Sequence, residues 1–401
     1  MSAFAWLSYS ESERRKALDV ISLFRERDTR DELGIGVIRD AFADLLFPGT
    51  STIQTRARYF LFVPWLYQRL EKKRVRSAEI AERARRDELA LIEHLAESDD
   101  PDGTIGIEAR QTLKRLPSNV YWQGLERWGL RVYPGSQDQY HRSLDGFYAR
   151  LGRALQNDDG EVVGDHARRN WHAGLPAWPD GFPDGASFYL TQSEAEYLRD
   201  RLLATASRSL LAFLVGEAKP NDPVDFPWMH PQQDAFGATI GEQLFHARCF
   251  SEVVHGAALL YNLMLARLRK AKDLVEDYEN GLDEWVKGVR EAHARLGKWD
   301  RDRFWEIVLR AAPGAIPIPT RRFVDEWLAL ALDRDLKSID SNPKATNLIR
   351  ERERTLKRGQ ARLESTRALE LWGGAAGASQ LDYRWRTVQT IVADIQRGFG
   401  A

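Results

Sequence analysis

The segment "LLFPGTSTIQTRARYFLFVPW", residues 45–65, places hydroxyl, amide and guanidinium groups at the edge of an apolar run. Thr50 or Ser51, directly after a Pro-Gly turn, is a typical helix N-cap residue. A helix start offers free backbone N–H groups to an anion, and arginine forks pair well with phosphate. We therefore expect the tip of this helical hairpin to contact DNA through Thr50, Ser51, Thr52, Gln54, Arg56 and Arg58.

The same arginines have a structural alternative. Asp40 and Asp44 are four residues apart on the preceding predicted helix, so they share one face. An antiparallel hairpin could bring that face to Arg56 and Arg58, which would then be paired inside the fold.

A second group of polar residues lies in "CFSEVVHGAALLYNLMLA", residues 249–266. Glu252, His255 and Asn262 share one side of a helix that is apolar almost all round, which predicts a buried helix. Buried polar groups must be satisfied, so they face either a hydrogen-bond network or a pocket. In a pocket, Glu252 with His255 would be an acid/base pair, and Asn262 would bind a substrate edge. We expect no metal, because two possible ligands at this spacing are common by chance.

The segment "NPKATNLIRERERTLKRGQARLESTR", residues 342–367, has the strongest local basic excess. Arg350, Arg354 and Lys357 stand at spacings of four and three, which predicts one basic helical face. Such a face suits a DNA backbone. The alternative is a charged face that simply meets water.

Weaker candidates for base recognition occur in two other places. Asn119, Tyr121 and Gln123 follow Pro117 near a predicted helix start, and His172 lies in the aromatic loop 169–183. These residues could stack on a nucleobase or hydrogen-bond to it. Core packing is the alternative use of the aromatic side chains.

Helical periodicity dominates the elements that must position these residues, and no strand of convincing length is evident. The sequence therefore predicts a mainly α, multi-helical globular protein with long Gly/Pro-rich loops and little or no sheet. Asp382 is expected to cap the last helix, and Pro64 to kink or break the third. We expect an N-terminal helical region (1–156), an aromatic Gly/Pro-rich loop or linker (157–190) and a C-terminal helical region (191–401). Helices are predicted near residues 10–27, 33–46, 51–72, 78–97, 107–116, 117–128, from 191, 240–272, 275–296, 301–311, 321–334, 342–372 and 384–397.

Composition limits the function classes. The chain of 401 residues has a net charge of −1, so a nucleic acid would have to meet a local basic patch. Its single cysteine, Cys249, excludes a disulfide framework and a cysteine-rich zinc site. The N-terminus lacks the pattern of a signal peptide, and no transmembrane helix is expected. We expect a cytoplasmic protein without a cofactor.

Several long segments resemble a bacterial family of unknown function found in phage-defence loci. They are "TRDELGIGVIRDAFADLLFPGTSTIQTRARYFLFVPW", "LPSNVYWQGLERWG", "FSEVVHGAALLYNLMLA" and "LDYRW", and the resemblance covers nearly the full chain. It connects the chain with a phage-defence DNA glycosylase, which removes glucosylated hydroxymethylcytosine from phage DNA and leaves abasic sites.

The resemblance implies double-stranded, modified phage DNA as the partner, but it assigns no catalytic residue. A glycosylase must grip phosphates, flip a nucleotide and enclose its base. Glu252 is then the first candidate for a carboxylate that orients water or stabilises positive charge on the sugar. Asp44 and Asp40, beside the hairpin tip, are the next candidates. No lysine stands out as a Schiff-base nucleophile, which favours a monofunctional enzyme. The alternative is a non-catalytic DNA-binding or scaffold component of a defence locus. A nuclease is disfavoured, because no acidic-plus-lysine cluster suits magnesium.

Overall fold

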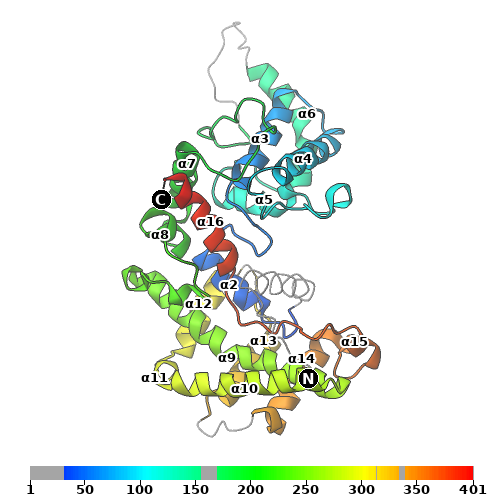
Figure 1. Cartoon of the computed structure of the whole chain (residues 1–401), viewed down its shortest axis with the longest axis vertical. Helices are drawn as coiled ribbons and strands as arrows, with labels where there is room; N and C mark the ends of the chain where they lie inside the picture. The colour runs from blue at the N-terminus through cyan, green and yellow to red at the C-terminus, as the bar shows by residue number, and fades with distance from the viewer. Residues whose placement is uncertain (1–30, 155–168, 313, 334–338, 401) are drawn as a thin grey trace, which may run out of the picture. The chain divides into compact units, whose positions relative to one another are not determined.

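The computed structural model describes residues 31–154, 169–312, 314–333 and 339–400 (Figure 1). The helix predicted at residues 10–27 lies outside these ranges. Within them the chain forms α-helices and short 3₁₀ helices, with no strand and one isolated bridge between Arg131 and Trp171. The prediction of a mainly α fold is confirmed.

The chain forms two compact units, and each is discontinuous in sequence. Unit 1 contains residues up to Phe42 and Phe245–Tyr383, and unit 2 contains Ala43–Leu244 and Arg384–Ala401. The boundaries between the units therefore fall at other places than residues 157–190, where the sequence suggested a linker.

Unit 2 carries both a continuous series of helices and the C-terminal helix. Its helices are α3 (Tyr59–Lys72), α4 (Ile80–Ala96), α5 (Pro117–Arg127), α6 (Gln137–Ala154), α7 (Gln192–Ala206), α8 (Leu210–Gly216) and α16 (Trp385–Gly398). Figure 1 shows α3 beside α4, α5 and α6. Aromatic residues on α3, including Tyr59, Phe60, Phe62 and Trp65, are buried here.

Unit 1 is built around the long helix α9 (Ala238–Arg269), most of which belongs to it. The other helices of this unit are α10 (Lys272–Glu291), α11 (His293–Leu296), α12 (Arg301–Ala311), α13 (Ile318–Ala331), α14 (Pro343–Lys357) and α15 (Thr366–Glu370). α2 (Gly36–Leu46) contributes residues to both units. By length and composition α9 could cross a membrane, but 83% of its most apolar window is buried inside the protein, as in a core helix.

Several local predictions of helix starts are confirmed. Pro117 stands at the first turn of α5, where its missing N–H costs nothing. α7 starts at the predicted position, where Thr191 and Glu194 form a capping box. α12 covers the predicted residues 301–311 and is capped by Asp300. Gly256 on α9 lies against Trp285, whose ring would be 2.3 Å from an added Cβ atom, so a larger residue does not fit there.

Other boundaries differ from the prediction. α3 begins at Tyr59 instead of Ser51, and it continues through Pro64 without a break. Residues 107–116 form turns and a short 3₁₀ helix in place of an α-helix. The helix predicted at 342–372 ends at Lys357, since Arg358 has a left-handed φ of 51°. Asp382 does not cap α16, whose N-cap residue is Arg384 with a φ of 72°.

Candidate functional sites

The Pro-Gly turn leads into a closed loop and not into a helix. The Thr50 hydroxyl donates to the Phe47 carbonyl (2.7 Å). The Gln54 side chain accepts from the Ser51 N–H (3.2 Å) and donates to the Gly49 carbonyl (3.2 Å), while Thr52 is exposed. The predicted anion site at a helix start is therefore wrong at these residues, because α3 begins only after Arg58.

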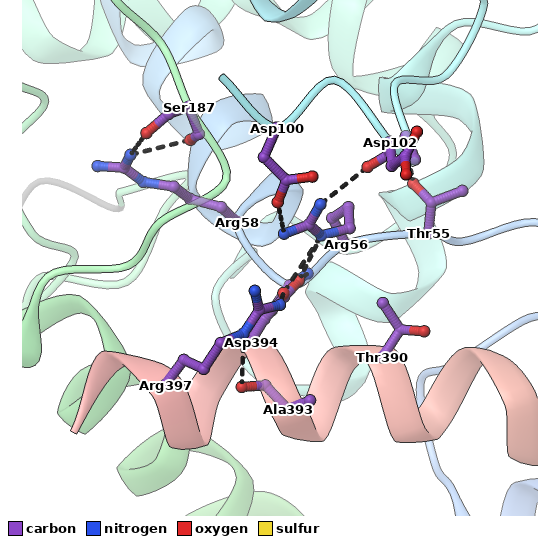
Figure 2. Close-up of polar contacts among 12 residues, drawn as sticks. Thr55, Arg56, Arg58, Asp100, Asp102, Ser187, Thr390, Ala393, Asp394 and Arg397 are labelled. Carbon is purple, nitrogen blue, oxygen red and sulfur yellow. Dashed lines mark hydrogen bonds and ion pairs between the residues drawn. The ribbon is translucent and has the colours of Figure 1, made fainter. Parts of the chain in front are cut away.

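Arg56 is buried at the centre of a polar cluster (Figure 2). Its Nε lies 3.0 Å from Asp394 on α16, its Nη2 2.8 Å from Asp100, and its Nη1 donates to the Asp102 carbonyl at 2.8 Å. Burial alone would lower the pKa of the guanidinium, but hydrogen bonds from it to Asp394 and Asp100 raise this pKa overall. The hydrogen bond from Arg56 lowers the pKa of Asp100. Arg56 is thus a structural cation in this conformation.

Arg58 is buried in the same way with other partners. Its Nη2 lies 2.8 Å from Glu194, and its Nη1 donates to the Ser187 carbonyl at 2.9 Å (Figure 2 shows the latter). Asp40 and Asp44, the expected alternative partners, pair elsewhere, Asp40 with Arg39 (3.0 Å) and Asp44 with Arg384 (2.7 Å). The arginines are internally paired, as in the structural alternative, but with carboxylates that lie far away in sequence.

The polar side of α9 holds a loop of its own unit. The Asn262 amide donates to the carbonyls of Ala258 (2.8 Å) and Ala376 (2.9 Å), and its oxygen accepts from the Ala376 N–H (2.7 Å). His255 Nε2 lies 3.0 Å from the Ala378 carbonyl, so it carries the proton and donates. Burial lowers the pKa of this imidazole. Both residues therefore fix the segment 372–378 that follows α15.

Glu252 has a different environment from these two neighbours. Its carboxylate lies between two arginines, with Arg248 Nε at 2.8 Å and the Arg295 guanidinium on the other oxygen. The side chain is 21% exposed, so solvent reaches it. Glu252 and His255, the predicted acid/base pair, have the separate partners named above, and no hydrogen bond joins them among the described residues. The catalytic role of Glu252 stays a prediction.

The four base-recognition candidates are in unit 2 and have mixed settings. The Tyr121 hydroxyl is buried and joins the loop backbone, since it accepts from the Thr55 N–H (2.9 Å) and donates to the Arg56 carbonyl (2.8 Å). Asn119 is exposed and its oxygen accepts from the N–H of Leu116 at 3.0 Å, while Gln123 is exposed. The His172 ring lies 3.2 Å from the Tyr197 hydroxyl and 3.1 Å from Arg201 Nη1. The structure does not gather them into one site.

The basic helix presents fewer free charges than its sequence suggests. Arg350 and Arg354 are exposed on α14, as predicted. Lys357 instead turns to the buried carboxylates of Glu32 and Glu353 within unit 1. The expected single face of three cations is therefore wrong at Lys357, because two buried carboxylates require a nearby cation.

Two carboxyl groups of unit 2, Glu88 and Glu71, lack a cationic partner in the described part of the chain and are not among the sequence-predicted residues. Glu88 on α4 is fully buried; its oxygens accept from the N–H and the hydroxyl of Ser118, both at 2.7 Å. Burial raises the pKa of Glu88 to about 7. Glu71, near the end of α3, is half-buried and accepts bonds from three neutral donors, the Tyr140 hydroxyl, Asn170 and Trp171. Both lie in highly charged stretches of sequence, where a glutamate is typical of a surface, so no sequence signal marked them.

Replacing Arg56 with alanine should destabilise the protein by about 3–5 kcal/mol, because it leaves Asp394 buried without its main cation. Urea denaturation followed by circular dichroism measures the effect. The control is Arg322→Ala, which breaks an exposed ion pair with Glu326 and should leave the unfolding midpoint unchanged. If the Arg56 variant is as stable as the natural protein but binds DNA more weakly, the result would support the hypothesis that this loop contacts DNA.

Glu88 should make stability depend on pH near neutrality. Its folded pKa of about 7 exceeds the ordinary value of 4.5, so its contribution is complete below pH 4.5 and is lost as pH rises through 7. The loss amounts to about 3 kcal/mol for this group. Urea midpoints from pH 5 to 8.5 should fall more steeply for the natural protein than for Glu88→Gln, which does not titrate. Parallel curves would show that Glu88 is ionised in the folded protein throughout this range.

Comparison with known proteins adds a family and no activity. No curated protein and no solved structure matches the chain. Among the described residues, no group of three or more His, Cys, Asp and Glu side chains could hold a metal ion. A family model, described as a family of unknown function, matches residues 1–397. Because this match spans almost the whole sequence, the chain belongs to the family DUF6361.

Proposed function

We propose that the protein is a DNA glycosylase that excises a bulky modified base, glucosylated hydroxymethylcytosine, from phage DNA. The activity comes from the resemblance of the long segments quoted above. The observation that carries it is the exposed basic surface of α14 and its continuation in unit 1. Lys344, Arg350, Arg354, Arg358 and Arg367 are exposed there.

This surface is suited to a nucleic acid because the opposite, buried side of α14 is hydrogen-bonded to the rest of unit 1. Arg352, on that buried side, donates to the Leu33 carbonyl (2.8 Å) and to the Thr320 hydroxyl (2.8 Å). The exposed Arg350 and Arg354 therefore project from a fixed backbone. Such a surface grips phosphates without reading sequence, as a flipping enzyme requires.

Glu252 is the first candidate for the catalytic carboxylate of this enzyme. Two arginines flank its carboxylate, and its partial exposure admits water. An ionised carboxylate can orient that water or stabilise positive charge as the base leaves. Lys357, the lysine of α14 that faces inward, is neutralised by Glu32 and Glu353 and is a poor Schiff-base nucleophile. We therefore propose a monofunctional, cofactor-free reaction in the cytoplasm.

A second candidate function is a non-catalytic DNA-binding or scaffold component of a defence locus. A specific observation favours it: the hydrogen bonds of Asn262 and His255 go to the segment 372–378, so these side chains build the fold. The DNA-binding surface of α14 would serve this function equally well.

The assay that separates the two functions uses glucosylated phage DNA and unmodified DNA, each incubated with protein and then treated with alkali. A glycosylase yields alkali-sensitive breaks in the modified DNA alone. Glu252→Gln should lower base release by about 10²-fold or more, as loss of acid/base catalysis does, while folding and DNA binding persist. Glu326→Gln, at an exposed glutamate of the same unit, is the matched control. Binding without breaks would support the scaffold, and immediate magnesium-dependent breaks would indicate a nuclease.

The α14 surface predicts a particular salt dependence. Arg350→Ala with Arg354→Ala should weaken binding equally for all DNA sequences and reduce the slope of log K against log salt by up to about two. Lys357 is left intact because it neutralises buried carboxylates. The control, Arg83→Ala with Arg142→Ala, removes two exposed arginines from unit 2 and should leave the slope unchanged. Equal slopes in both double variants would show that α14 meets only water.

A further inference from the structure

Three polar side chains of unit 2 meet beside the C-terminal end of α5. His172 comes from the aromatic loop, and Tyr197 and Arg201 come from α7. Nδ1 of the His172 ring lies 3.2 Å from the Tyr197 hydroxyl, and Nε2 lies 3.1 Å from Arg201 Nη1. Tyr197 and Arg201 are four residues apart, so they share one face of α7. All three side chains are partly exposed, so a ligand in solution can reach them.

The backbone of two other segments holds these side chains in place. The His172 N–H donates to the Leu130 carbonyl (2.8 Å), which fixes the start of the aromatic loop. Arg201 Nε donates to the Trp128 carbonyl (3.2 Å) at the end of α5. The arrangement is therefore set by the fold of unit 2 and not by α7 alone.

Gly129, which follows α5, is needed for Arg201 to lie where it does. Its φ of 68° is in the left-handed region that favours glycine. An added Cβ atom at this position would be 2.3 Å from Arg201 Nη2, so the guanidinium lies directly against the glycine. Nη2 has no hydrogen-bond partner among the described residues. A capping role at the end of α5 explains the bond of Nε, but it leaves the Nη2 group without a function.

Arg201 differs from the buried arginines of this unit because no carboxylate pairs with it. Arg56 and Arg58 each form an ion pair. Within the described residues, the Arg201 side chain contacts two neutral acceptors, the Trp128 carbonyl and His172. A guanidinium with neutral partners has its charge and its remaining N–H groups available to an anion.

These three residues also bring together more hydrogen-bond donors than acceptors. Burial and the charge of Arg201 lower the pKa of His172, so the imidazole is neutral at neutral pH and has one acceptor nitrogen. Arginine can only donate, so Nε2 accepts and the proton is on Nδ1. Nδ1 faces both the Tyr197 hydroxyl and the Gly174 N–H (3.2 Å). The Tyr197 oxygen can accept the Nδ1 proton, which leaves the phenol hydrogen and the Gly174 N–H without an acceptor among the described residues. The other tautomer turns an imidazole N–H toward the guanidinium instead.

We propose that Arg201, Tyr197 and His172 bind a phosphate group of the DNA backbone. The phosphate oxygens accept from the guanidinium and from the Tyr197 hydroxyl, and they supply the acceptors and the negative charge that this group of residues lacks. Water can occupy the same donors in the free protein, but only an anion also neutralises Arg201. Such a contact positions DNA without reading its sequence.

The assignment rests on the proposed function for the source of the phosphate alone. It uses neither Glu252 nor the α14 surface, which belong to unit 1. The same donors would also take a free phosphate compound, so the experiment must distinguish the two sources.

Two substitutions on α7 test the site. Arg201→Gln removes the charge, and Tyr197→Phe removes only the hydroxyl. The matched control is Arg199→Gln, which removes an arginine of the same helix that already pairs with Asp200 at 2.9 Å. Urea midpoints of the three variants check that each is folded.

DNA binding is followed by fluorescence anisotropy of an unmodified duplex over a range of salt concentrations. Arg201→Gln should reduce the slope of log K against log salt by about one, as expected for one lost phosphate contact. Tyr197→Phe should weaken binding several-fold without changing the slope, because the hydroxyl is uncharged. Arg199→Gln should bind like the natural protein. An unchanged slope in folded Arg201→Gln would overturn the site. If that variant does not fold, unchanged affinity in Tyr197→Phe would overturn it.

Inorganic phosphate is the probe that identifies the source. It should stabilise the natural protein against urea more than chloride does at equal ionic strength, and Arg201→Gln should reduce this effect while Arg199→Gln should not. If Arg201→Gln reduces the effect of phosphate but binds DNA normally, the ligand is a free phosphate compound and the assignment to DNA is overturned.

Base release from glucosylated DNA separates this site from the proposed activity. A reduced salt slope in a protein that releases no base would keep the phosphate site and remove the glycosylase. Base release by a protein whose α7 variants bind DNA like the natural protein would keep the glycosylase and remove the phosphate site.

Discussion

The arrangement of unit 2 depends on the buried ion pair between Arg56 and Asp394, two residues 338 positions apart in sequence. Either charge alone would be very unfavourable in the interior, so the loop after α2 and the C-terminal helix α16 must come together for both to be buried. Both members of the pair have further hydrogen-bond partners. Asp394 also accepts from the Ala57 N–H (2.9 Å) and from Arg397. Arg56 also donates to Asp100 and to the Asp102 carbonyl. The last helix of the chain therefore closes a unit that begins near its first described helix.

In unit 1, uncharged side chains of α9 provide the hydrogen bonds that an irregular buried segment needs. The segment 372–378 has no helical hydrogen bonds of its own, and buried backbone groups need partners. Asn262 supplies both a donor and an acceptor to Ala376, and His255 donates to Ala378. Further along, Ser251 donates to the Leu381 carbonyl (2.7 Å). The polar stripe on an otherwise apolar helix is thus explained by an irregular segment that lies along it.

The sequence predicts much of this structure where the signal is local. Helix periodicity, Pro117 at a first turn and the Thr191–Glu194 capping box are properties of neighbouring residues, and they were sufficient for the fold class and for several helix starts. Burial of α9 was also predictable from its apolar circumference. The partners of Arg56 and Arg58 could not be predicted from the sequence. Asp394 and Glu194 are distant in sequence, and no local pattern favours them over Asp40 and Asp44. Lys357 shows the same limit, since its spacing on α14 gives no sign of Glu32.

These cases suggest how a polar residue that builds the fold differs from one that serves a ligand. Arg56, Arg58 and Asn262 were attractive candidates by residue type, yet the hydrogen bonds that each side chain makes go to the protein itself. Residues that can serve a ligand must keep some capacity free, at a cost in stability. The exposed arginines on α14 keep part of their hydrogen-bonding capacity free because they face solvent. Incomplete pairing of a buried group does not by itself mark a functional site, since Ser51 Oγ and Arg58 Nε are also without a hydrogen-bond partner in a segment that builds the fold.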